Sequence, residues 1–367
     1  MPKIAYVITD SNIGGAGQHL IALINNLSPH FVPEVILPIN SRLTPLLLDL
    51  GVGVVCHEVE HIAEQSFSWA GMRAIGQVLK KIKPDIVHTH SSFSGRMAAK
   101  FYTRAKIIHT VNSAFPVPAR RKKFPLKQFY GFINNSFSHR VIIVSPVLKK
   151  MLTQAGVKSK KIRQVFNGVP RARQYNPGEL EVIRNKYNVP KDHFTVTYLA
   201  RLVDIKGHDY VLDMAREMPY NVTILIAGDG EYREHLEARI AEEGIHNAMM
   251  LGFVSNIDEL LAITDVQINA SYVSEATSLA LLSGMSVGVP AVATLIGGNP
   301  YVIKQNENGI IVPPQDVEAL DNAITRLKDD KTFYMELSKG AYKIYEKQFT
   351  DVKMTQDTEQ IYMELLK

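Results

Sequence analysis

Short apolar segments alternate with longer amphipathic ones along nearly the whole chain, and this alternation limits the fold more than any other feature. The apolar segments of the first half are Ile4–Ile8, Pro33–Leu37, Ile86–His88, Lys106–Thr110 and Val141–Val144. Those of the second half are Thr195–Leu199, Val222–Ala227, Met249–Leu251, Val266–Asn269, Ala291–Thr294 and Gly309–Val312. Stretches with apolar residues at helical spacing lie between them, among them Gln18–Leu27, Trp69–Ile82, Pro146–Ala155, Tyr210–Glu217 and Tyr232–Glu243. Strands that alternate with helices in this way predict α/β architecture, with doubly wound parallel sheets and right-handed crossovers.

The length and the charge distribution both predict two domains. A chain of 367 residues is too long for one ordinary core. Turn residues at 167–170 predict a boundary there, between a domain of residues 1–170 and one of residues 171–348. Residues 1–170 contain 22 Lys+Arg and 7 Asp+Glu, a net +15, whereas the remainder contains 19 and 29, a net −10. The basic half is therefore expected to face an anionic partner.

The composition also limits the compartment. The single cysteine, Cys56, excludes a disulfide framework and a multi-cysteine zinc site, and it fits a reducing cytoplasm. The apolar segment after Lys3 is a strand pattern rather than a signal peptide. No apolar run reaches the roughly 20 residues of a membrane-spanning helix. We therefore expect a cytoplasmic protein.

The segment from Asn269 to Pro300 combines a carboxylate, two hydroxyl residues and a small-residue apolar run. Thr277 and Ser278 follow Glu275, and both are good N-cap residues, so a helix is expected to begin at one of them. The unpaired N–H groups of a first helical turn lie at the positive end of the helix dipole and suit a phosphate. A carboxylate such as Glu275 suits hydroxyl groups instead. A phosphate beside a polyol is what a nucleotide-sugar presents.

Two further strand ends carry groups suited to phosphate. The glycine-rich segment 14–17 follows the first strand, where glycines let a backbone approach a ligand, although a tight strand-to-helix turn explains it equally well. Arg201 and Lys206 follow a later strand, at the sheet edge where open α/β folds bind ligands. Arginine offers a bidentate fork to phosphate, and lysine a mobile point charge.

The histidines of the sequence VHTHSS do not predict a metal site. His88 and His90 share one face of a strand, because alternate residues do. No carboxylate or cysteine accompanies them. A buried strand histidine and one pocket histidine are the better interpretation.

Taken in order, several motifs resemble those of the retaining family 4 glycosyltransferases. The resemblance runs from residue 4 to about residue 350, through GGAGQHL, VHTHSS with Gly95-Arg96, IIVSP, NGV, RLVDIKG, IAGDGE, LGFVSNIDELL, and Glu275 to GGNP. The stretch LALLSGMSVGVPAV is similar to a bacterial branch that builds surface polysaccharides or lipid-linked sugars. The resemblance implies the GT-B fold, two Rossmann-like domains whose parallel sheets face each other across a cleft. A final helix at 349–367 would cross back toward the first domain.

The resemblance also implies roles for single residues. Arg201 and Lys206 would bind the donor diphosphate without a metal ion, and Glu275 would orient the donor sugar. The other donor-side residues would be Gly15 at the transferring sugar, Phe253 and Val254 near the base, Thr277, Ser278 and Leu279 at the phosphates, and Ser283. The acceptor-side residues would be Gly14, His90 and Asn112. No cofactor is implied, and a UDP-sugar is favoured over a GDP-sugar as the donor.

Two positions depart from the family pattern. Ser283 stands where members usually carry a carboxylate that binds the ribose hydroxyls, so weaker donor binding is expected. Asn112 stands where members commonly carry a histidine near the reacting sugar, and an asparagine cannot titrate. Both changes are compatible with activity, because charge stabilisation is the larger catalytic effect. Reduced or lost activity is the less favoured alternative.

A basic segment of the first half interleaves cations with aromatic residues. Residues 119–127 read ARRKKFPLK, and Phe129, Tyr130 and Phe132 follow. Such a segment suits nucleic acid, an anionic membrane surface or plain solvent. Because acceptors in the resembling branch are often lipid-linked, we favour a peripheral contact with the inner face of the cytoplasmic membrane over nucleic acid.

The sequence thus predicts a retaining, metal-independent glycosyltransferase that moves a sugar from a nucleotide-diphosphate donor to a surface-polysaccharide or lipid-linked acceptor. Two rival interpretations stay open. One is a weakly active or inactive relative that serves as a partner or sugar-binding subunit, motivated by Asn112 and Ser283. The other is a nucleotide-sugar 2-epimerase on the same architecture, since fold alone does not separate the two reactions.

Overall fold

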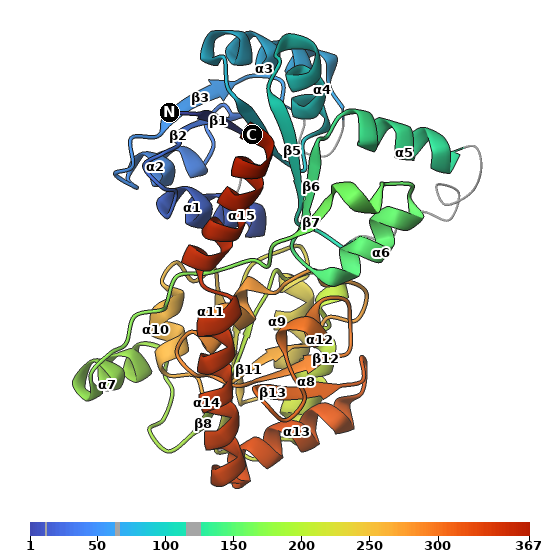
Figure 1. The fold of residues 1–367 in the computed structure, drawn as a ribbon. Helices are drawn as coiled ribbons and strands as arrows, with labels where there is room; N and C mark the ends of the chain where they lie inside the picture. Colours follow the sequence, from blue (N-terminus) through green and yellow to red (C-terminus); the bar gives the residue numbers. More distant parts are fainter. Residues whose placement is uncertain (12, 63–66, 115–125) are drawn as a thin grey trace. The chain divides into compact units, whose positions relative to one another are not determined.

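In the computed structural model, which describes residues 1–11, 13–62, 67–114 and 126–367, the chain forms two compact units (Figure 1). Unit 1 comprises residues 1–168 and 351–367, and unit 2 comprises residues 169–350. Most of the basic segment 119–127 lies outside the described residues.

Unit 1 is built on a seven-stranded parallel sheet in the order β3-β2-β1-β4-β5-β6-β7. Its strands are β1 (Lys3–Ile8), β2 (Val32–Pro38), β3 (Val55–Val59), β4 (Ile86–His90), β5 (Lys106–Val111), β6 (Arg140–Ile143) and β7 (Ile162–Gln164). Its helices are α1 (Gly15–Asn25), α2 (Leu43–Leu48), α3 (Trp69–Ile82), α4 (Phe93–Tyr102), α5 (Leu126–Ser136), α6 (Pro146–Gln154), the 3₁₀ helix η2 (Ser159–Lys161) and α15 (Asp351–Leu366). The expected doubly wound parallel arrangement is present.

The first strand shows why this sheet is covered on both faces. Ile4, Tyr6 and Ile8 point to one side and join a core with α1 and α15. Ala5 and Val7 point to the other side and join a core with α3 and α4. A strand that is apolar at successive positions can bury both sets only between two helical layers.

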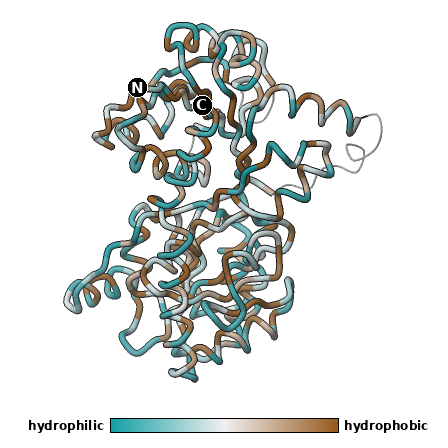
Figure 2. Tube along the Cα trace, in the orientation of Figure 1, coloured by the Kyte–Doolittle hydropathy of each residue, from teal (hydrophilic) through white to brown (hydrophobic). Residues whose placement is uncertain are grey.

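Unit 2 repeats the architecture with a six-stranded parallel sheet in the order β10-β9-β8-β11-β12-β13. Its strands are β8 (Phe194–Leu199), β9 (Val222–Ala227), β10 (Ala248–Gly252), β11 (Val266–Asn269), β12 (Ala291–Thr294) and β13 (Gly309–Val312). Its helices are α7 (Pro177–Lys186), η3 (Asp204–Lys206, 3₁₀), α8 (His208–Glu217), α9 (Arg233–Glu242), α10 (Ile257–Ala262), α11 (Leu279–Met285), α12 (Asn299–Val302), α13 (Val317–Asp329) and α14 (Lys331–Gln348). Figure 2 shows hydrophobic residues gathered along the strands and hydrophilic ones on outer helices such as α7.

The sequence analysis did not predict two strands of unit 1. β3, with the sequence VCHEV, is mostly exposed or half-buried, and β7 has only three residues. Both lie at the outer ends of the sheet. An edge strand buries too little side chain to require a continuous apolar run, so the apolar pattern that predicted the inner strands is weak there.

The last helix, α15, packs on unit 1. Met354, Ile361 and Tyr362 of α15 enter the core on the α1 side of the sheet. The side-chain amide of Asn26 donates to Asp351 Oδ2 at 2.8 Å, which fixes the start of the helix. Residues separated by most of the chain thus share one core.

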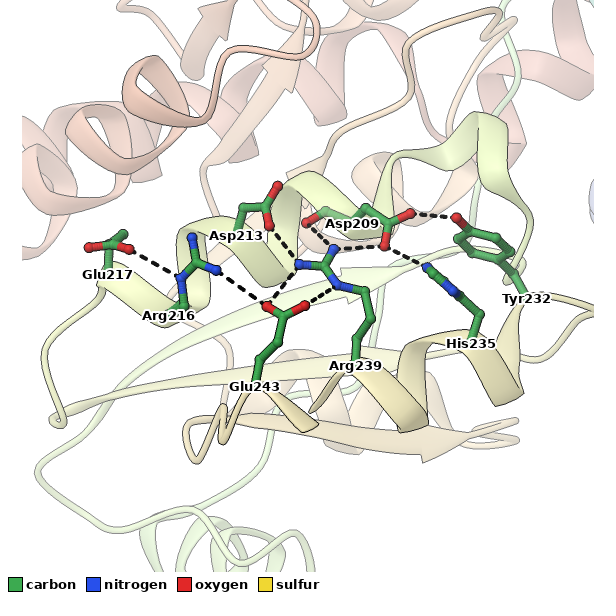
Figure 3. Close-up of polar contacts among 8 residues, drawn as sticks. All are labelled: Asp209, Asp213, Arg216, Glu217, Tyr232, His235, Arg239 and Glu243. Atoms are coloured by element: carbon green, nitrogen blue, oxygen red, sulfur yellow. Dashed lines mark hydrogen bonds and ion pairs between the residues drawn. The ribbon is translucent and has the colours of Figure 1, made fainter. Parts of the chain in front are cut away.

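An ion-pair cluster joins α8 to α9 in unit 2 (Figure 3). The Arg239 guanidinium of α9 contacts three carboxylates, Asp209 at 2.8 Å, Asp213 at 2.7 Å and Glu243 at 2.6 Å. Burial alone would raise the pKa of Asp209, but hydrogen bonds from Tyr232 and Arg239 lower it. The three carboxylates more than neutralise the Arg239 guanidinium, so it does not attract an anionic ligand. The cluster instead links α8 to α9.

Among the described residues, no helix is long and apolar enough to cross a membrane.

Candidate functional site

In unit 2, a short turn after β8 carries Lys206 to the carboxyl edge of the sheet. The Tyr198 hydroxyl donates to the Lys206 carbonyl and anchors the turn. The next residue, Gly207, has φ +73°, and a Cβ there would lie 2.3 Å from the Ala270 carbonyl oxygen. Only glycine permits this close approach between the turn and the loop after β11.

Lys206 Nζ lies 2.6 Å from Glu275 Oε2. The side chain of Lys206 is 18% exposed and that of Glu275 is 10% exposed. The same carboxylate oxygen accepts from the Ser271 hydroxyl at 3.1 Å and from the Asn269 amide at 3.3 Å. The structure therefore brings together two of the three predicted catalytic side chains, and it holds the carboxylate with two neutral donors besides the lysine.

The backbone of Glu275 is fixed as firmly as its side chain. Its carbonyl accepts from the Gly298 N–H at 2.8 Å. Gly297 has φ +52°, and a Cβ there would lie 2.1 Å from the Glu275 carbonyl oxygen. The Gly297-Gly298 turn is thus in direct contact with the backbone of Glu275.

The expected helix start is confirmed at Ser278. The Ser278 hydroxyl caps α11 by accepting from the Leu281 N–H at 3.4 Å, and Thr277 just before it is buried. Arg201 follows β8, is exposed and forms no ion pair with any residue in the described ranges. Its charge is available for a ligand.

Three other predicted donor-side residues take different environments. Ser283 is buried, and its hydroxyl donates to the Leu279 carbonyl one turn earlier at 3.1 Å, so its own helix uses it. The Phe253 ring is 69% exposed after β10. Val254 is half-buried and packs against the core formed with α7 and α10.

In unit 1, helix α1 begins at Gly15 with Gly14 as its N-cap residue, as the glycine-rich segment predicts. His90 ends β4 and is only 1% exposed, and both of its ring nitrogens lack a hydrogen-bond partner among the described residues. The ring stacks on His88 with centroids 4.7 Å apart. Both polar atoms of the Asn112 side chain are likewise buried and unpartnered in the described part of the chain.

Histidines and a tyrosine form a buried group around His90. His88 Nδ1 lies 2.6 Å from the Tyr362 hydroxyl, and His88 Nε2 lies 2.6 Å from Thr110 Oγ1. His19 Nδ1 lies 2.9 Å from Asn167 Oδ1. Burial lowers the pKa of His19 to about 4 and that of His88 to about 3. Burial also lowers the pKa of His90, so these rings are neutral near pH 7.

Because these histidines are buried in their neutral form, we expect unit 1 to become less stable as the pH falls. Each ring titrates near pH 6.5 when unfolded, so its stabilising effect is complete above that pH and declines toward its lower folded pKa. Between pH 7.5 and pH 5 we expect His19 and His88 each to lower the free energy of unfolding by roughly 2 kcal/mol. Urea titration followed by the fluorescence of Trp69, the single tryptophan, measures this in unit 1.

A His19→Gln variant is the control, because glutamine cannot be protonated. Its unfolding free energy should fall less over the same pH interval, by about the same 2 kcal/mol. Carboxyl groups titrate mainly below this interval. An unfolding free energy that stays constant from pH 7.5 to pH 5 would contradict the burial of neutral histidines.

Several residues that organise the site were not singled out from the sequence. His19 lies within GGAGQHL, and Asn269 and Ser271 lie within the segment that starts at Asn269. Asn269 and Ser271 gave no signal, because a small polar residue beside a carboxylate is common. His19 gave none, because its partner Asn167 is far away in the sequence. No group of three or more His, Cys, Asp or Glu with metal-binding geometry exists in the described ranges.

Comparison with protein families covers both halves of the chain. Residues 13–173 match the family described as Glycosyltransferase Family 4, and residues 180–344 match Glycosyl transferases group 1. The chain belongs to glycosyltransferase family 4. This confirms the predicted family and the predicted enzyme class, a glycosyltransferase.

Relatives of this family 4 glycosyltransferase include named bacterial enzymes. The UDP-Gal:alpha-D-GlcNAc-diphosphoundecaprenol alpha-1,3-galactosyltransferase of Escherichia coli is 25% identical over 344 residues, which span 90% of this chain and 87% of the relative. The lipopolysaccharide core biosynthesis glycosyltransferase LpsD of Rhizobium meliloti is 23% identical over 93% of both chains.

Solved structures confirm the predicted GT-B fold of this family 4 glycosyltransferase. A glycosyltransferase from Rickettsia africae superposes with a TM-score of 0.87 at 23% identity and covers 100% of this chain and 99% of its own. HepE of Anabaena, in complex with UDP and glucose, superposes with a TM-score of 0.86 at 21% identity, over 99% of this chain and 100% of its own.

Proposed function

We propose that this glycosyltransferase moves a sugar, with retention of configuration, from a UDP-sugar to a surface-polysaccharide or lipid-linked acceptor. The observation that carries the proposal is the contact of Lys206 with Glu275 at the carboxyl edge of the unit 2 sheet. This contact places a cation for a diphosphate next to a carboxylate for sugar hydroxyls. The UDP in the HepE complex and the diphosphoundecaprenol in the name of the Escherichia coli relative support the donor and the acceptor class.

In the proposed reaction, the bond between the sugar C1 and the β-phosphate oxygen breaks, and the acceptor oxygen forms a new bond to C1. Negative charge develops on the departing diphosphate, where Arg201 and Lys206 stabilise it. The acceptor proton passes to a phosphate oxygen of the leaving group. The acceptor attacks from the leaving-group face, so no protein nucleophile is assigned.

The other proposed contacts follow from the family to which the chain belongs. Glu275 orients the donor sugar through its hydroxyls, and Gly15 lies at the transferring sugar. The N–H groups of Thr277, Ser278 and Leu279 bind the phosphates, while Phe253 and Val254 lie near the base. Gly14, His90 and Asn112 form the acceptor side, where the unpartnered polar atoms of His90 and Asn112 suit sugar hydroxyls.

Calorimetric titration with UDP, GDP, ADP and their sugar conjugates, in EDTA, tests the proposal. We expect UDP to bind, and Arg201→Ala and Lys206→Ala each to weaken its binding by roughly tenfold or more, since each removes one charge-assisted contact. Product analysis with a UDP-sugar and a lipid-diphosphate sugar should show a new glycoside of unchanged anomeric configuration. Interconversion of the nucleotide-sugar without an acceptor would instead identify an epimerase.

A weakly active or inactive partner subunit is the second candidate. The observation that favours it is the Ser283 hydroxyl, which is bonded within its own helix and offers little to a ribose. Ser283→Glu together with Asn112→His restores the usual family residues. A gain in donor affinity and turnover would show that these positions limit the wild-type protein. Strong turnover of the wild-type protein would exclude this candidate.

A further inference from the structure

The two carboxylate oxygens of Glu275 have different surroundings. Oε2 accepts from Lys206 at 2.6 Å, from Ser271 at 3.1 Å and from Asn269 at 3.3 Å. Oε1 accepts no hydrogen bond from any residue in the described ranges, and it is not fully buried. The protein therefore occupies one oxygen and leaves the other for a ligand.

The side-chain amide of Asn269 is oriented by two donors on its far side. Its Oδ1 accepts from the Ser271 N–H at 3.3 Å and from the Asn299 side-chain amide at 3.3 Å. If the Asn269 amide turned over, its NH₂ group would face these two donors and its oxygen would face the carboxylate of Glu275. Both contacts would be repulsive, so the Asn269 Nδ2 group is held toward Glu275.

Asn299 is itself fixed at the end of a neighbouring strand. It is the first residue of α12, directly after the Gly297-Gly298 turn, and it is 1% exposed. Its Nδ2 also donates to the Thr294 carbonyl at the end of β12, at 3.0 Å. Because β12 runs parallel to β11 and pairs with it, Asn299 links the carboxyl ends of the two strands. A chain of contacts thus leads from β12 through Asn299 and Asn269 to Glu275.

Ser271 has a separate support from β12. The Thr294 hydroxyl donates to the Ser271 carbonyl, and the Ser271 hydroxyl donates to Glu275. All four supporting residues are at most 5% exposed: Asn269, Ser271, Thr294 and Asn299. Buried polar side chains are costly unless they are hydrogen-bonded, so a group of four around one carboxylate indicates that its position matters.

We propose that Glu275 Oε2 is fixed by the protein while Oε1 accepts a hydrogen bond from a hydroxyl of the donor sugar. The positioning residues for this contact are Asn269, Ser271, Thr294 and Asn299. The inference rests on the proposed function, because it takes the donor sugar as the ligand of Glu275. A carboxylate oxygen only accepts hydrogen bonds, so the sugar must present a free hydroxyl at that carbon.

The two neutral donors matter most when Lys206 contacts the phosphates. In the proposed reaction the charge that develops on the departing diphosphate attracts Lys206 and competes with Glu275 for it. A carboxylate held by the lysine alone would then lose its position. Glu275 keeps the contacts with Asn269 and Ser271, so one lysine can serve the diphosphate without releasing the sugar.

Calorimetric titration of the full chain with UDP, UDP-glucose and UDP-galactose tests the inference. The quantity to compare is the sugar preference, defined as the Kd for UDP divided by the Kd for the UDP-sugar that binds more tightly. Asn269→Ala removes one donor to Oε2 and should lower the sugar preference by roughly tenfold. The Kd for UDP should stay nearly unchanged, because UDP lacks the sugar that Oε1 contacts.

A double variant shows whether Asn269 acts through the carboxylate. Glu275→Ala alone should lower the sugar preference at least as much as Asn269→Ala does. Asn269→Ala added to Glu275→Ala should lower it no further, because the group that Asn269 positions is already gone. A full additional loss would mean that Asn269 contacts the sugar itself, and it would overturn the positioning role.

Thr294 allows a rescue by a conservative change. Thr294→Val keeps the shape of the side chain and removes the hydroxyl that supports Ser271. It should lower the sugar preference several-fold, whereas Thr294→Ser keeps a hydroxyl and should retain most of the preference. Equal preferences in the two variants would contradict the role of this hydroxyl.

Asn308 provides the matched control for Asn269. It is a completely buried asparagine of the same unit, and its Nδ2 donates to the Val302 carbonyl at 3.0 Å. It lies just before β13, at the amino edge of the sheet and thus at the opposite edge from Glu275. Asn308→Ala should reduce stability against urea, measured by circular dichroism, and leave the sugar preference unchanged.

The assignment of Oε1 is tested with UDP-glucose and UDP-galactose analogues in which fluorine replaces one hydroxyl at a time. Fluorine cannot donate a hydrogen bond. Loss of affinity at one carbon in the wild-type protein, but not in Glu275→Ala, would identify the hydroxyl that Oε1 binds. Equal losses in both proteins at every carbon would show that Oε1 accepts from no sugar hydroxyl.

The results also separate this inference from the proposed function. An unchanged sugar preference in Asn269→Ala, or an equal change in Asn308→Ala, would overturn the inference while UDP binding is retained. Binding of UDP without measurable binding of either UDP-sugar would overturn it as well. Failure of the wild-type protein to bind UDP would instead refute the proposed donor.

Discussion

Replacing Lys206 by methionine is expected to lower kcat/KM by about 100- to 1,000-fold. The substitution keeps the length of the side chain and removes its charge. The departing diphosphate then loses one of its two proposed cations, and Glu275 loses the partner that lies 2.6 Å away. Glu275 keeps the hydrogen bonds from Ser271 and Asn269, so its position should change little. Initial rates at several donor concentrations measure the effect.

A second lysine provides a matched control. Lys328 Nζ lies 2.6 Å from Asp329 Oδ1, the same separation as in the Lys206–Glu275 pair, and it belongs to α13 of the same unit. Lys328→Met therefore removes an ion pair of equal length outside the site, and it should leave the rate unchanged. A Lys206→Met enzyme that retains wild-type kcat/KM would refute the assigned role of Lys206.

Replacing Gly297 by alanine is expected to reduce activity by at least about tenfold and to lower the free energy of unfolding by about 2 to 4 kcal/mol. The new Cβ would lie 2.1 Å from the Glu275 carbonyl oxygen, and backbone atoms cannot rotate away as a flexible side chain can. The turn must shift, and Glu275 shifts with it. Activity assays and urea unfolding of the same preparation measure both effects.

A Gly51→Ala variant separates the effect of the steric clash from the cost of a left-handed backbone conformation. Its φ is +68° and a Cβ there would meet nothing within 4 Å, whereas Gly297 combines a φ of +52° with a backbone clash. Gly51→Ala should therefore cost only about 1 kcal/mol and leave activity intact. Similar losses of activity and stability in the two variants would show that the Gly297-Gly298 turn does not fix the position of Glu275.

The sequence analysis succeeded where one local pattern determines the structure. The amphipathic stretch Trp69–Ile82 has the bounds of α3, because Ser68 caps its start and Lys83 ends it in the left-handed conformation. The helix start at Ser278 followed from the hydroxyl beside a small-residue apolar run. These elements depend on neighbours in the sequence, which can be read directly.

Tertiary packing explains what the sequence analysis could not foresee. The three contacts to Glu275 Oε2 come from η3, the end of β11 and the residues just after it, and no spacing rule predicts which small polar side chain reaches a carboxylate. Likewise, Ser283 could be recognised as a departure from the family, but its bond to Leu279 depends on rotamer choice within the helix. The burial of His90 between His88 and His19 depends on how α1 packs on the sheet.

Residues 86–168 of unit 1 contain no aspartate or glutamate, and this has a consequence for how their charge responds to pH. A surface that mixes lysines with carboxylates changes its charge when acid protonates the carboxylates, but this segment has none to protonate. Burial lowers the pKa of each of the four histidines within it, His88, His90, His109 and His139, so they resist protonation as well. The positive charge of these residues therefore changes little around neutral pH.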